Sequence, residues 1–473
     1  MLTRRGFLVF GAGVGGAVMM PRALLAPGAE AAAVPGAATA AATPFTRPMP
    51  VPPTLAPIAT IAGTDIYDLA LRPTTVEVLP GLSTEVLSYA RGFFGGPTIR
   101  ARTRRPVKVQ IRNQQDMAAN VHLHGANVPA SSDGHPLDVI QPGSSRLYHY
   151  PNRQVGATLW YHDHTHHMEA EHVYRGMHGF YLIQGTDEDA LGLPRGQYDV
   201  PIMLRDAKVD ETSGQLVFGS PFDRPLLLAN GVNQPYFAVA ARKYRFRLLN
   251  CATERVFRLR LDGAAMTQIA SDGGLLPEPV TRTQISLGSA ERVEVVVDFS
   301  AFPIGTQLVL SDASGAQLLR FDVTRTAADP SVVPAALRPL APMPPSTVLR
   351  EVTLGFDFTS SPPVGLVNGR PYDPERVDFR VVRGTTETWR ITNTDAFVPH
   401  TFHLHLVQFR VLERNGGAPN ADDAGRKDTV QLPPGTSVTV QATFGDYLGQ
   451  YAYHCHFLEH SSVGMMAQME VVA

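Results

Sequence analysis

Histidine is unevenly distributed along this chain. All 16 histidines lie between His122 and His178 or between His400 and His460. Histidines that serve as ordinary polar residues would be scattered along the sequence, whereas neutral imidazole is the most common protein ligand for metals. The distribution therefore predicts a metal site assembled from two segments that lie far apart in the sequence.

Within these two segments, four clusters have short and regular spacings. They are His122 and His124; His162 and His164; His400, His403 and His405; and His454, His456 and His460. In an extended segment, side chains two positions apart project from the same face. Each H-x-H pair is therefore expected to present both imidazoles to one side.

The last cluster combines histidine with a thiol. Cys455 lies between His454 and His456, so in an extended segment it points away from both, and one tripeptide can reach two metal centres. A thiolate, two imidazoles and a weak thioether are the ligands of a blue copper electron-transfer site. We predict that site from Cys455, His460, His400 and an axial Met465.

The remaining cluster histidines predict a second copper centre with imidazole ligands only. They are His122, His124, His162, His164, His403, His405, His454 and His456. Zinc is the alternative metal for histidine and cysteine. Zinc sites close with four ligands, however, and would leave most of this set unused.

The elements that must position these side chains are strands. Residues 107–112, 292–297 and 437–440 alternate apolar and polar side chains, which is typical of half-buried strands. Long amphipathic helical patterns are absent, and 41 glycines and 39 prolines favour many turns. The sequence therefore predicts an all-β fold of sandwich or barrel domains.

An internal repeat indicates how many such domains there are. VKVQIRN ends at Asn113, YRFRLLN at Asn250 and TWRITN at Asn393, and a second set of similar segments begins at Gly156, Gly305 and Gly449. Three copies of one β-domain are predicted, at 45–190, 191–335 and 336–473. The middle copy has no histidine and is expected to be a spacer without copper.

The N-terminus resembles a twin-arginine export signal. Arg4 and Arg5 precede an apolar run that continues to Met20, and small residues follow at 31–33. We expect residues 1–34 to be the signal and 35–44 a linker, within an Ala/Pro/Thr-rich stretch (35–57) that is a linker or an arm lying on the first domain. No later stretch is long and apolar enough to span a membrane. A periplasmic or extracellular monomer is expected.

The net charge bears on nucleic-acid binding, and the cysteine count bears on the state of the thiols. A formal net charge of -2 provides no electrostatic support for nucleic-acid binding. Cys251 and Cys455 are the two cysteines, and the assignment of Cys455 to a metal leaves Cys251 as a buried free thiol.

Four motifs resemble the copper signatures of the multicopper oxidase family: HLHG, WYHDH, HTFHLH and HCHFLEHSSVGMM. The stretches YPNRQ, RKYRFRLL and SDGGLL look most like the branch of bilirubin oxidases, bacterial spore-coat laccases and phenoxazinone synthases. The resemblance covers essentially the whole mature chain. It implies three consecutive cupredoxin-like Greek-key domains, with a type 1 copper in the third and a trinuclear cluster between the first and third.

The resemblance also implies how the ligands are shared among four copper ions. His122 and His403 would hold the type 2 copper. The type 3 pair would be held by His124, His162, His164, His405, His454 and His456. Electrons would pass from the type 1 copper through Cys455 to the two flanking histidines, which makes these three residues the electron-transfer path.

Acidic residues matter because the reduction of dioxygen to water consumes protons. Asp133 matches an acid that the family places near the trinuclear cluster. Bacterial members of this branch typically carry glutamate after the last type 1 histidine, where this chain has Ser461, and a hydroxyl cannot hold a proton in reserve. Asp133 is therefore the predicted reservoir. Glu459 is a weaker candidate, because its expected place at a strand end allows the side chain to face solvent.

The other six histidines are expected to support the structure or lie at the surface: His135, His149, His166, His167, His172 and His178. The leading functional hypothesis is a laccase-like oxidase of phenolic, aromatic-amine or bilirubin-like compounds, with dioxygen as acceptor. A metallo-oxidase of cuprous or ferrous ions is the alternative, although the chain lacks a methionine-rich insertion. A non-enzymatic exported cupredoxin-fold protein is a distant third and would not require every ligand position to be filled.

Overall fold

Three consecutive stretches of the chain each build two β-sheets. The structure is a computed structural model that describes residues 43–346 and 348–473. The predicted signal (1–34) and nearly all of the predicted linker (35–44) lie outside the described residues. We call the three stretches the first (54–184), second (199–326) and third (348–472) sandwich, because buried side chains from both sheets of each stretch pack into a common core.

In the first sandwich, one sheet has the order β1 (Thr54–Leu55), β5 (Thr98–Arg102), β10 (His178–Gln184), β9 (Ala157–His162), β7 (His122–His124). The other has the order β2 (Ala59–Ile61), β3 (Thr64–Val76), β6 (Val107–Asn113), β8 (Ser145–Tyr150), and β4 (Thr84–Ser88) pairs with β3.

In the second sandwich, the larger sheet has the order β13 (Val232–Asn233), β12 (Leu226–Ala229), β11 (Asp199–Ala207), β15 (Lys243–Asn250), β20 (Arg292–Asp298), β17 (Met266–Ser271), β18 (Gly274–Arg282). The smaller has the order β14 (Tyr236–Ala241), β22 (Gln317–Thr326), β21 (Gln307–Asp312), β16 (Phe257–Leu261), β19 (Ile285–Leu287).

In the third sandwich, one sheet has the order β24 (Val364–Val367), β23 (Val348–Asp357), β26 (Thr386–Asn393), β30 (Ser437–Thr443), β28 (Arg410–Arg414). The other has the order β25 (Phe379–Val382), β32 (Met466–Val472), β31 (Gly449–Cys455), β27 (His400–Leu404), β29 (Thr429–Leu432).

Helical segments among the described residues are short. They are α1 (Glu169–Arg175), α2 (Leu458–Ser462) and the 3-10 turns η1 (Ala130–Ser132), η2 (Glu188–Ala190), η3 (Gly196–Tyr198), η4 (Phe299–Ala301) and η5 (Ala421–Asp423). The predicted all-β class is confirmed. Within the described ranges, no helix is long and apolar enough to cross a membrane.

The repeat seen in the sequence has a structural counterpart. Asn113, Asn250 and Asn393 are buried at the ends of β6, β15 and β26. Each side-chain amide donates hydrogen bonds to backbone carbonyls that follow it in the same sandwich, in loops or at strand ends, and each side-chain oxygen accepts from the backbone N–H two residues later. The loop after each strand is thereby held in one conformation, because buried polar groups must be paired.

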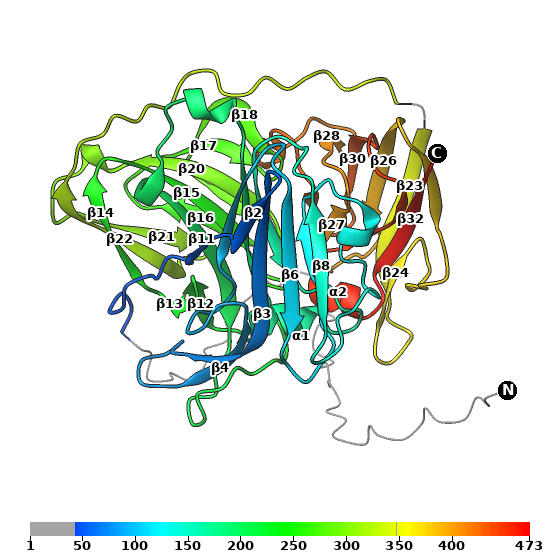
Figure 1. Ribbon diagram of the computed structural model, residues 1–473, viewed down its shortest axis with the longest axis horizontal. Helices are drawn as coiled ribbons and strands as arrows, with labels where there is room; N and C mark the ends of the chain where they lie inside the picture. Colours follow the sequence, from blue (N-terminus) through cyan, green and yellow to red (C-terminus); the bar gives the residue numbers. More distant parts are fainter. Residues whose placement is uncertain (1–42, 347) are drawn as a thin grey trace. The chain divides into compact units, whose positions relative to one another are not determined.

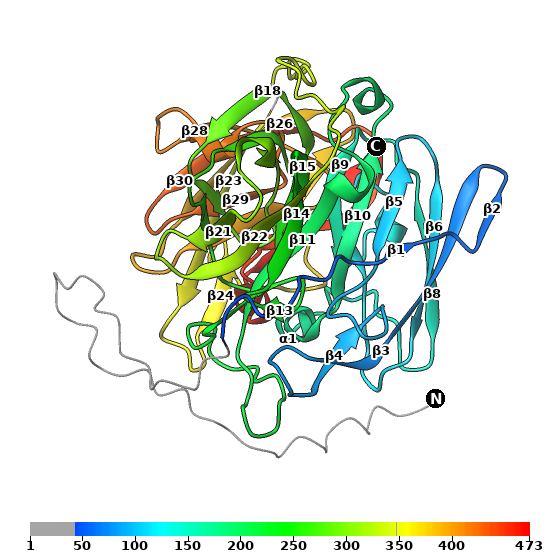
Figure 2. The same ribbon diagram turned by 90° about the vertical axis from the view of Figure 1, so that its left-hand side faces the viewer.

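Figures 1 and 2 show the blue-to-cyan strands of the first sandwich beside the green strands of the second, where β9 contacts β20. The yellow-to-red strands belong to the third sandwich, in which β31 contacts η1 of the first. The ends of β7, β9, β27 and β31 meet where the first and third sandwiches face each other. Those ends carry the histidine clusters.

The segment before β1 does not lie where the sequence suggested. The backbone N–H of Phe45 donates to Gln234 and that of Met49 to Tyr236, and Met49 is buried in the core of the second sandwich. Of the two expected alternatives, a linker or an arm on the first domain, the arm is wrong for residues 45–50, whose backbone pairs with the second sandwich although Arg47 also contacts Glu77 of the first. β14 is an edge strand of the second sandwich, so one side of its backbone is free of neighbouring strands and can pair with this segment.

Candidate metal centres

The predicted thiolate site is assembled from β27, β31 and α2. His400 begins β27, Cys455 ends β31 and His460 lies in α2. Cys455 Sγ is 3.5 Å from Nδ1 of His460 and 3.7 Å from Nδ1 of His400, and the two Nδ1 atoms are 3.0 Å apart. All three side chains are buried. Two imidazoles and a thiol thus point at one position.

Met465 and Glu459 flank this group. Met465 is fully buried, and its carbonyl accepts from the N–H of Cys455 at 3.1 Å. Glu459 lies in α2 rather than at a strand end, so the expectation of a solvent-facing side chain is wrong. Its carboxylate accepts hydrogen bonds from Arg224, at 2.8 Å, and from Thr253. β31 ends at Cys455, and the following helical turn directs Glu459 toward the second sandwich.

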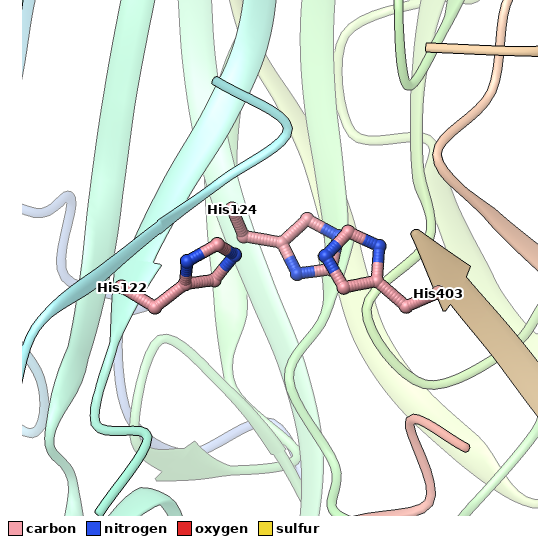
Figure 3. A group of neighbouring side chains, drawn as sticks. All are labelled: His122, His124 and His403. Atoms are coloured by element: carbon pink, nitrogen blue, oxygen red, sulfur yellow. The ribbon is translucent and has the colours of Figure 1, made fainter. Parts of the chain in front are cut away.

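The eight remaining predicted ligands converge in three groups whose candidate ligand atoms lie within 4.8 Å of one another. The groups are His122, His124 and His403; His124, His162 and His456; and His164, His405 and His454. Every group combines histidines of the first sandwich with histidines of the third. Figure 3 shows His122 and His124 reaching in from one side and His403 from the other, with the rings of His124 and His403 stacked at 3.7 Å.

The orientation of the rings fits a metal cluster. His122 Nε2, His124 Nδ1, His162 Nε2 and His403 Nε2 are buried without a hydrogen-bond partner in the described part of the chain. The opposite nitrogen of each ring contacts a backbone carbonyl or a carboxylate at 2.6–2.9 Å. Metal-bound histidines have this arrangement, in which one nitrogen is fixed by an outer partner and the other is left for the ion.

Burial also sets the protonation states. Desolvation lowers the pKa of all eight imidazoles, to about 3 at His162 and about 4 at His454, and it lowers that of His400 and His460 to about 4. Neutral imidazole is the form that binds metals. Burial raises the pKa of the Cys455 thiol to about 12, so a metal that binds here must displace its proton.

Asp133 touches two of the converging histidines. Its carboxylate Oδ2 lies 2.8 Å from His405 Nδ1 and its carbonyl oxygen 2.6 Å from His122 Nδ1. The side chain is fully buried, and desolvation raises the pKa of its carboxyl. Asp133 thus lies at the histidine cluster, where an acid was expected from the sequence.

A second buried acid was missed by the sequence analysis. Asp428 Oδ1 lies 2.9 Å from His124 Nε2, and its carbonyl oxygen lies 2.8 Å from His403 Nδ1. Both carboxylate oxygens of Asp428 accept from Arg292 of the second sandwich at 2.6 Å. No regular spacing relates Asp428 to the histidines, although it lies in the third sandwich with His403, and Arg292 belongs to the second repeat, which has no histidine. The second sandwich is therefore more than a spacer.

The six other histidines lie around the cluster or on the surface. His172 lies 3.0 Å from Asp163, the residue between His162 and His164, and His135 contacts Gln468 at 3.0 Å. His149 and His167 are exposed, whereas His166 is half-buried and His178 is buried against Phe94. Cys251 is a buried free cysteine, as predicted.

Comparisons with known proteins agree over nearly the whole chain. Three family models described as multicopper oxidase match residues 70–188, 155–326 and 341–473. A laccase of Bacillus stratosphericus is 33% identical over 90% of this chain and 99% of its own length. A bilirubin oxidase of Albifimbria verrucaria is 35% identical over 89% and 80%.

Solved structures show the same similarity. A laccase of Pediococcus acidilactici superposes with a TM-score of 0.84 at 30% identity, covering 90% of this chain and 94% of that one. The predicted fold of three cupredoxin-like domains is thereby confirmed.

Proposed function

Because this chain belongs to the multicopper oxidase family and is an oxidoreductase that uses dioxygen, we propose that it is a laccase-like enzyme that oxidises phenolic or aromatic-amine compounds. Four electrons, removed one at a time from the substrate, reduce dioxygen to two waters. Bound copper would supply the one-electron redox chemistry and the reaction with dioxygen.

The tripeptide His454-Cys455-His456 is the observation that carries this proposal. Cys455 belongs to the thiolate group, and its two neighbours belong to two different imidazole groups. A covalent path through a single peptide linkage on either side thus connects a site suited to accepting single electrons with one suited to binding dioxygen.

Membership of the multicopper oxidase family implies how the ligands of four copper ions are shared, and the observed groups are compatible with this assignment. A type 1 copper would be held by His400, Cys455, His460 and Met465. His122 and His403 would hold a type 2 copper, and the type 3 pair would be held by His124, His162, His456, His164, His405 and His454. Asp133 positions His122 and His405 through its two contacts, and we propose that it also takes part in proton delivery.

The surroundings of His460 support an organic aromatic substrate. Phe356 packs edge-on against the His460 ring at 4.8 Å, and the neighbouring Phe358 is 56% exposed. Glu254 of the second sandwich lies 3.6 Å from His460 Nε2, the nitrogen that faces away from the thiolate. Aromatic surface beside a hydrogen-bond acceptor suits a phenol or an aromatic amine.

The metallo-oxidase alternative finds less support here. Thioether sulfur is the ligand that selects cuprous ions, yet Met465, Met466 and Met469 are all fully buried. A non-enzymatic role would leave the complete and buried ligand set without a purpose. Kinetics that favour cuprous ion over every phenol and aromatic amine would overturn the substrate assignment.

We further propose export by the twin-arginine route to the periplasm or the extracellular space, as a monomer. The Arg4-Arg5 pair and the apolar run that follows support export. Cell fractionation and light scattering of the mature protein test the two statements.

The proposed function predicts a blue protein. We expect the purified, copper-loaded enzyme to hold four copper ions per chain and to show an intense visible thiolate-to-copper band. Cys455→Ser should abolish the band and the oxidase activity while leaving three coppers in place. The measurements are metal analysis, absorption spectroscopy and oxygen uptake. A colourless wild-type protein loaded with zinc would contradict the proposal.

A further inference from the structure

Glu169, the first residue of α1, has a buried carboxyl and is not one of the proposed copper ligands. Its side chain has no exposed surface. One oxygen, Oε1, accepts a hydrogen bond from the Ser461 hydroxyl at 2.9 Å. The other, Oε2, has no partner among the described residues, and no lysine or arginine there forms an ion pair with Glu169. A carboxylate in this position would be poorly stabilised.

The location of Glu169 connects both parts of the site. Ser461 directly follows His460, a proposed type 1 ligand, and α1 packs against α2. On the other side Glu169 faces Asp163, which lies between His162 and His164. The buried carboxyl therefore lies between two segments: α2, which carries His460 of the proposed type 1 site, and the segment with His162 and His164, two proposed type 3 ligands.

Burial raises the pKa of Glu169 to about 7. The titratable groups that face it are Asp163, His172 on the next turn of α1, and Tyr372. The negative charge of Asp163 raises the pKa of Glu169 further, whereas the hydrogen bond from Ser461 lowers it. Glu169 can therefore hold or release a proton near neutral pH.

We propose that Glu169, acting through the hydroxyl of Ser461, stores a proton for the reduction of dioxygen. This inference rests on the proposed function and extends it to a residue that the sequence analysis missed. The acid expected after His460 is absent from α2, and α1 of the first sandwich supplies one from the opposite side.

The proton balance of the proposed step is simple. Reduction of one dioxygen to two waters takes four electrons from substrate and four protons from solvent. The O–H bond of the Glu169 carboxylic acid breaks as Ser461 Oγ accepts the proton, and the Ser461 hydroxyl releases its own proton toward the site of oxygen reduction. The Glu169 carboxylate then regains a proton from solvent. Leu458 O, 3.2 Å from Ser461 Oγ, is a second acceptor that lets the hydroxyl turn between partners.

Glu169→Gln removes the stored proton and keeps the shape of the side chain. In the copper-loaded enzyme, we expect reoxidation by dioxygen in single-turnover stopped flow to be at least about tenfold slower at pH 6, with copper content, blue colour and reduction by substrate unchanged. The wild-type reoxidation rate should fall as pH rises through about 7, because the Glu169 carboxyl loses its proton there. The difference in rate between wild type and Glu169→Gln should therefore shrink above that pH. Reoxidation of Glu169→Gln at the wild-type rate from pH 5 to 8 would overturn the proposal.

An infrared measurement provides a readout independent of turnover. The wild-type spectrum at pH 6 should contain the carbonyl stretch of a protonated carboxyl that Glu169→Gln lacks, and this band should vanish at high pH. Ser461→Ala keeps the carboxyl and removes its hydrogen-bond partner, so the band should shift. An unshifted band would contradict a proton store coupled to Ser461, and this test remains available if Glu169→Gln does not fold.

Two further variants separate proton storage from structural support. Glu171→Gln removes a partly exposed carboxylate of the same helix, paired with Arg175, and should leave reoxidation unchanged. Adding Ser461→Glu to Glu169→Gln returns a carboxyl from α2 and should restore the fast rate. A wild-type enzyme that does not consume dioxygen would refute the proposed function, whereas normal wild-type turnover with an unaffected Glu169→Gln would refute only this inference.

Discussion

At the scale of single residues, the site depends on how burial acts on different side chains. Desolvation keeps the ligand imidazoles neutral and ready for metal. The same effect makes carboxyls near the ligands basic enough to be protonated close to neutral pH, as at Glu169 and Glu254, whose pKa values are both raised to about 7. One physical cause thus prepares both ligands and acids.

We expect Met465 to tune the reduction potential of the proposed type 1 copper site. A thioether donates to the cupric ion and stabilises it, so Met465→Leu should raise the potential. The two side chains are similar in volume, so the fold should lose less than about 1.5 kcal/mol. Potentiometric titration measures the effect. An unchanged or lowered potential would show that Met465 is not a ligand of the copper.

Glu254 is expected to select among substrates. Its carboxylate near the outer nitrogen of His460 can accept a hydrogen bond from an amine or hydroxyl, and a hydrogen bond to a charged group contributes about 1.5–3 kcal/mol. Glu254→Gln should therefore lower kcat/KM for aromatic amines about tenfold or more. The kcat/KM for an uncharged substrate that has no hydrogen-bond donor should change little. Steady-state kinetics on matched substrates check this, and an equal loss for all substrates would contradict a recognition role.

At the scale of secondary structure, strand pairing brings the ligands into register. β27 pairs with β31 so that His403 is opposite His454 and Phe402 is opposite Cys455. In the first sandwich, β7 pairs with β9 so that His122 is opposite His162. Neighbouring strands therefore deliver imidazoles in pairs, and the turns at the strand ends decide how closely the two sandwiches approach.

Gly125, directly after β7, permits that approach. Its φ is +81°, and an added Cβ would lie 2.6 Å from both Arg292 and Asp428. Gly125→Ala should cost about 1–3 kcal/mol from overpacking, in addition to backbone strain, and reduce copper retention. Gly143→Ala is the control, because Gly143 has a similar φ of +72° and open space around it. Thermal unfolding of both variants tests the clash; equal losses of stability would exclude it.

At the scale of the whole molecule, all three sandwiches contribute to the imidazole cluster. The first and third supply the histidines, and the second supplies Arg292, which holds Asp428 against His124. Nearby, Lys427 of the third sandwich contacts Asp272 and Glu291 of the second. The middle sandwich thus fixes the third one through a buried network of charges.

Removal of Arg292 should reveal this dependence. Arg292 and Asp428 are both fully buried, and loss of one partner of a buried pair costs about 3–5 kcal/mol. Arg292→Met should lower the melting temperature and release imidazole-bound copper while the blue band persists. Arg320→Met, which breaks the more exposed pair with Asp322, should cost less than about 1 kcal/mol. Calorimetry and metal analysis check both; if Arg292→Met retains all its copper, Arg292 does not support the cluster.

Much of the site could be predicted from the sequence because the information is local. The period of two in H-x-H and H-C-H places side chains on defined faces of a strand, and repeated strands ending at Asn113, Asn250 and Asn393 mark three copies of one domain. Ligand chemistry then distinguishes copper from zinc.

Only the tertiary structure decided which groups surround those ligands. Arg292 and Glu254 come from the second sandwich, which has no histidine, and Asp428 and Glu169 contact residues of another sandwich, His124 and Ser461. No periodicity connects these four residues with the histidine clusters. Their contacts depend on how the three cores pack against one another, which is set by side chains that lie far apart in the sequence. For the same reason the sequence misplaced Glu459 and the segment before β1: each lies where one sandwich meets another, and local pattern carries no information about such an interface.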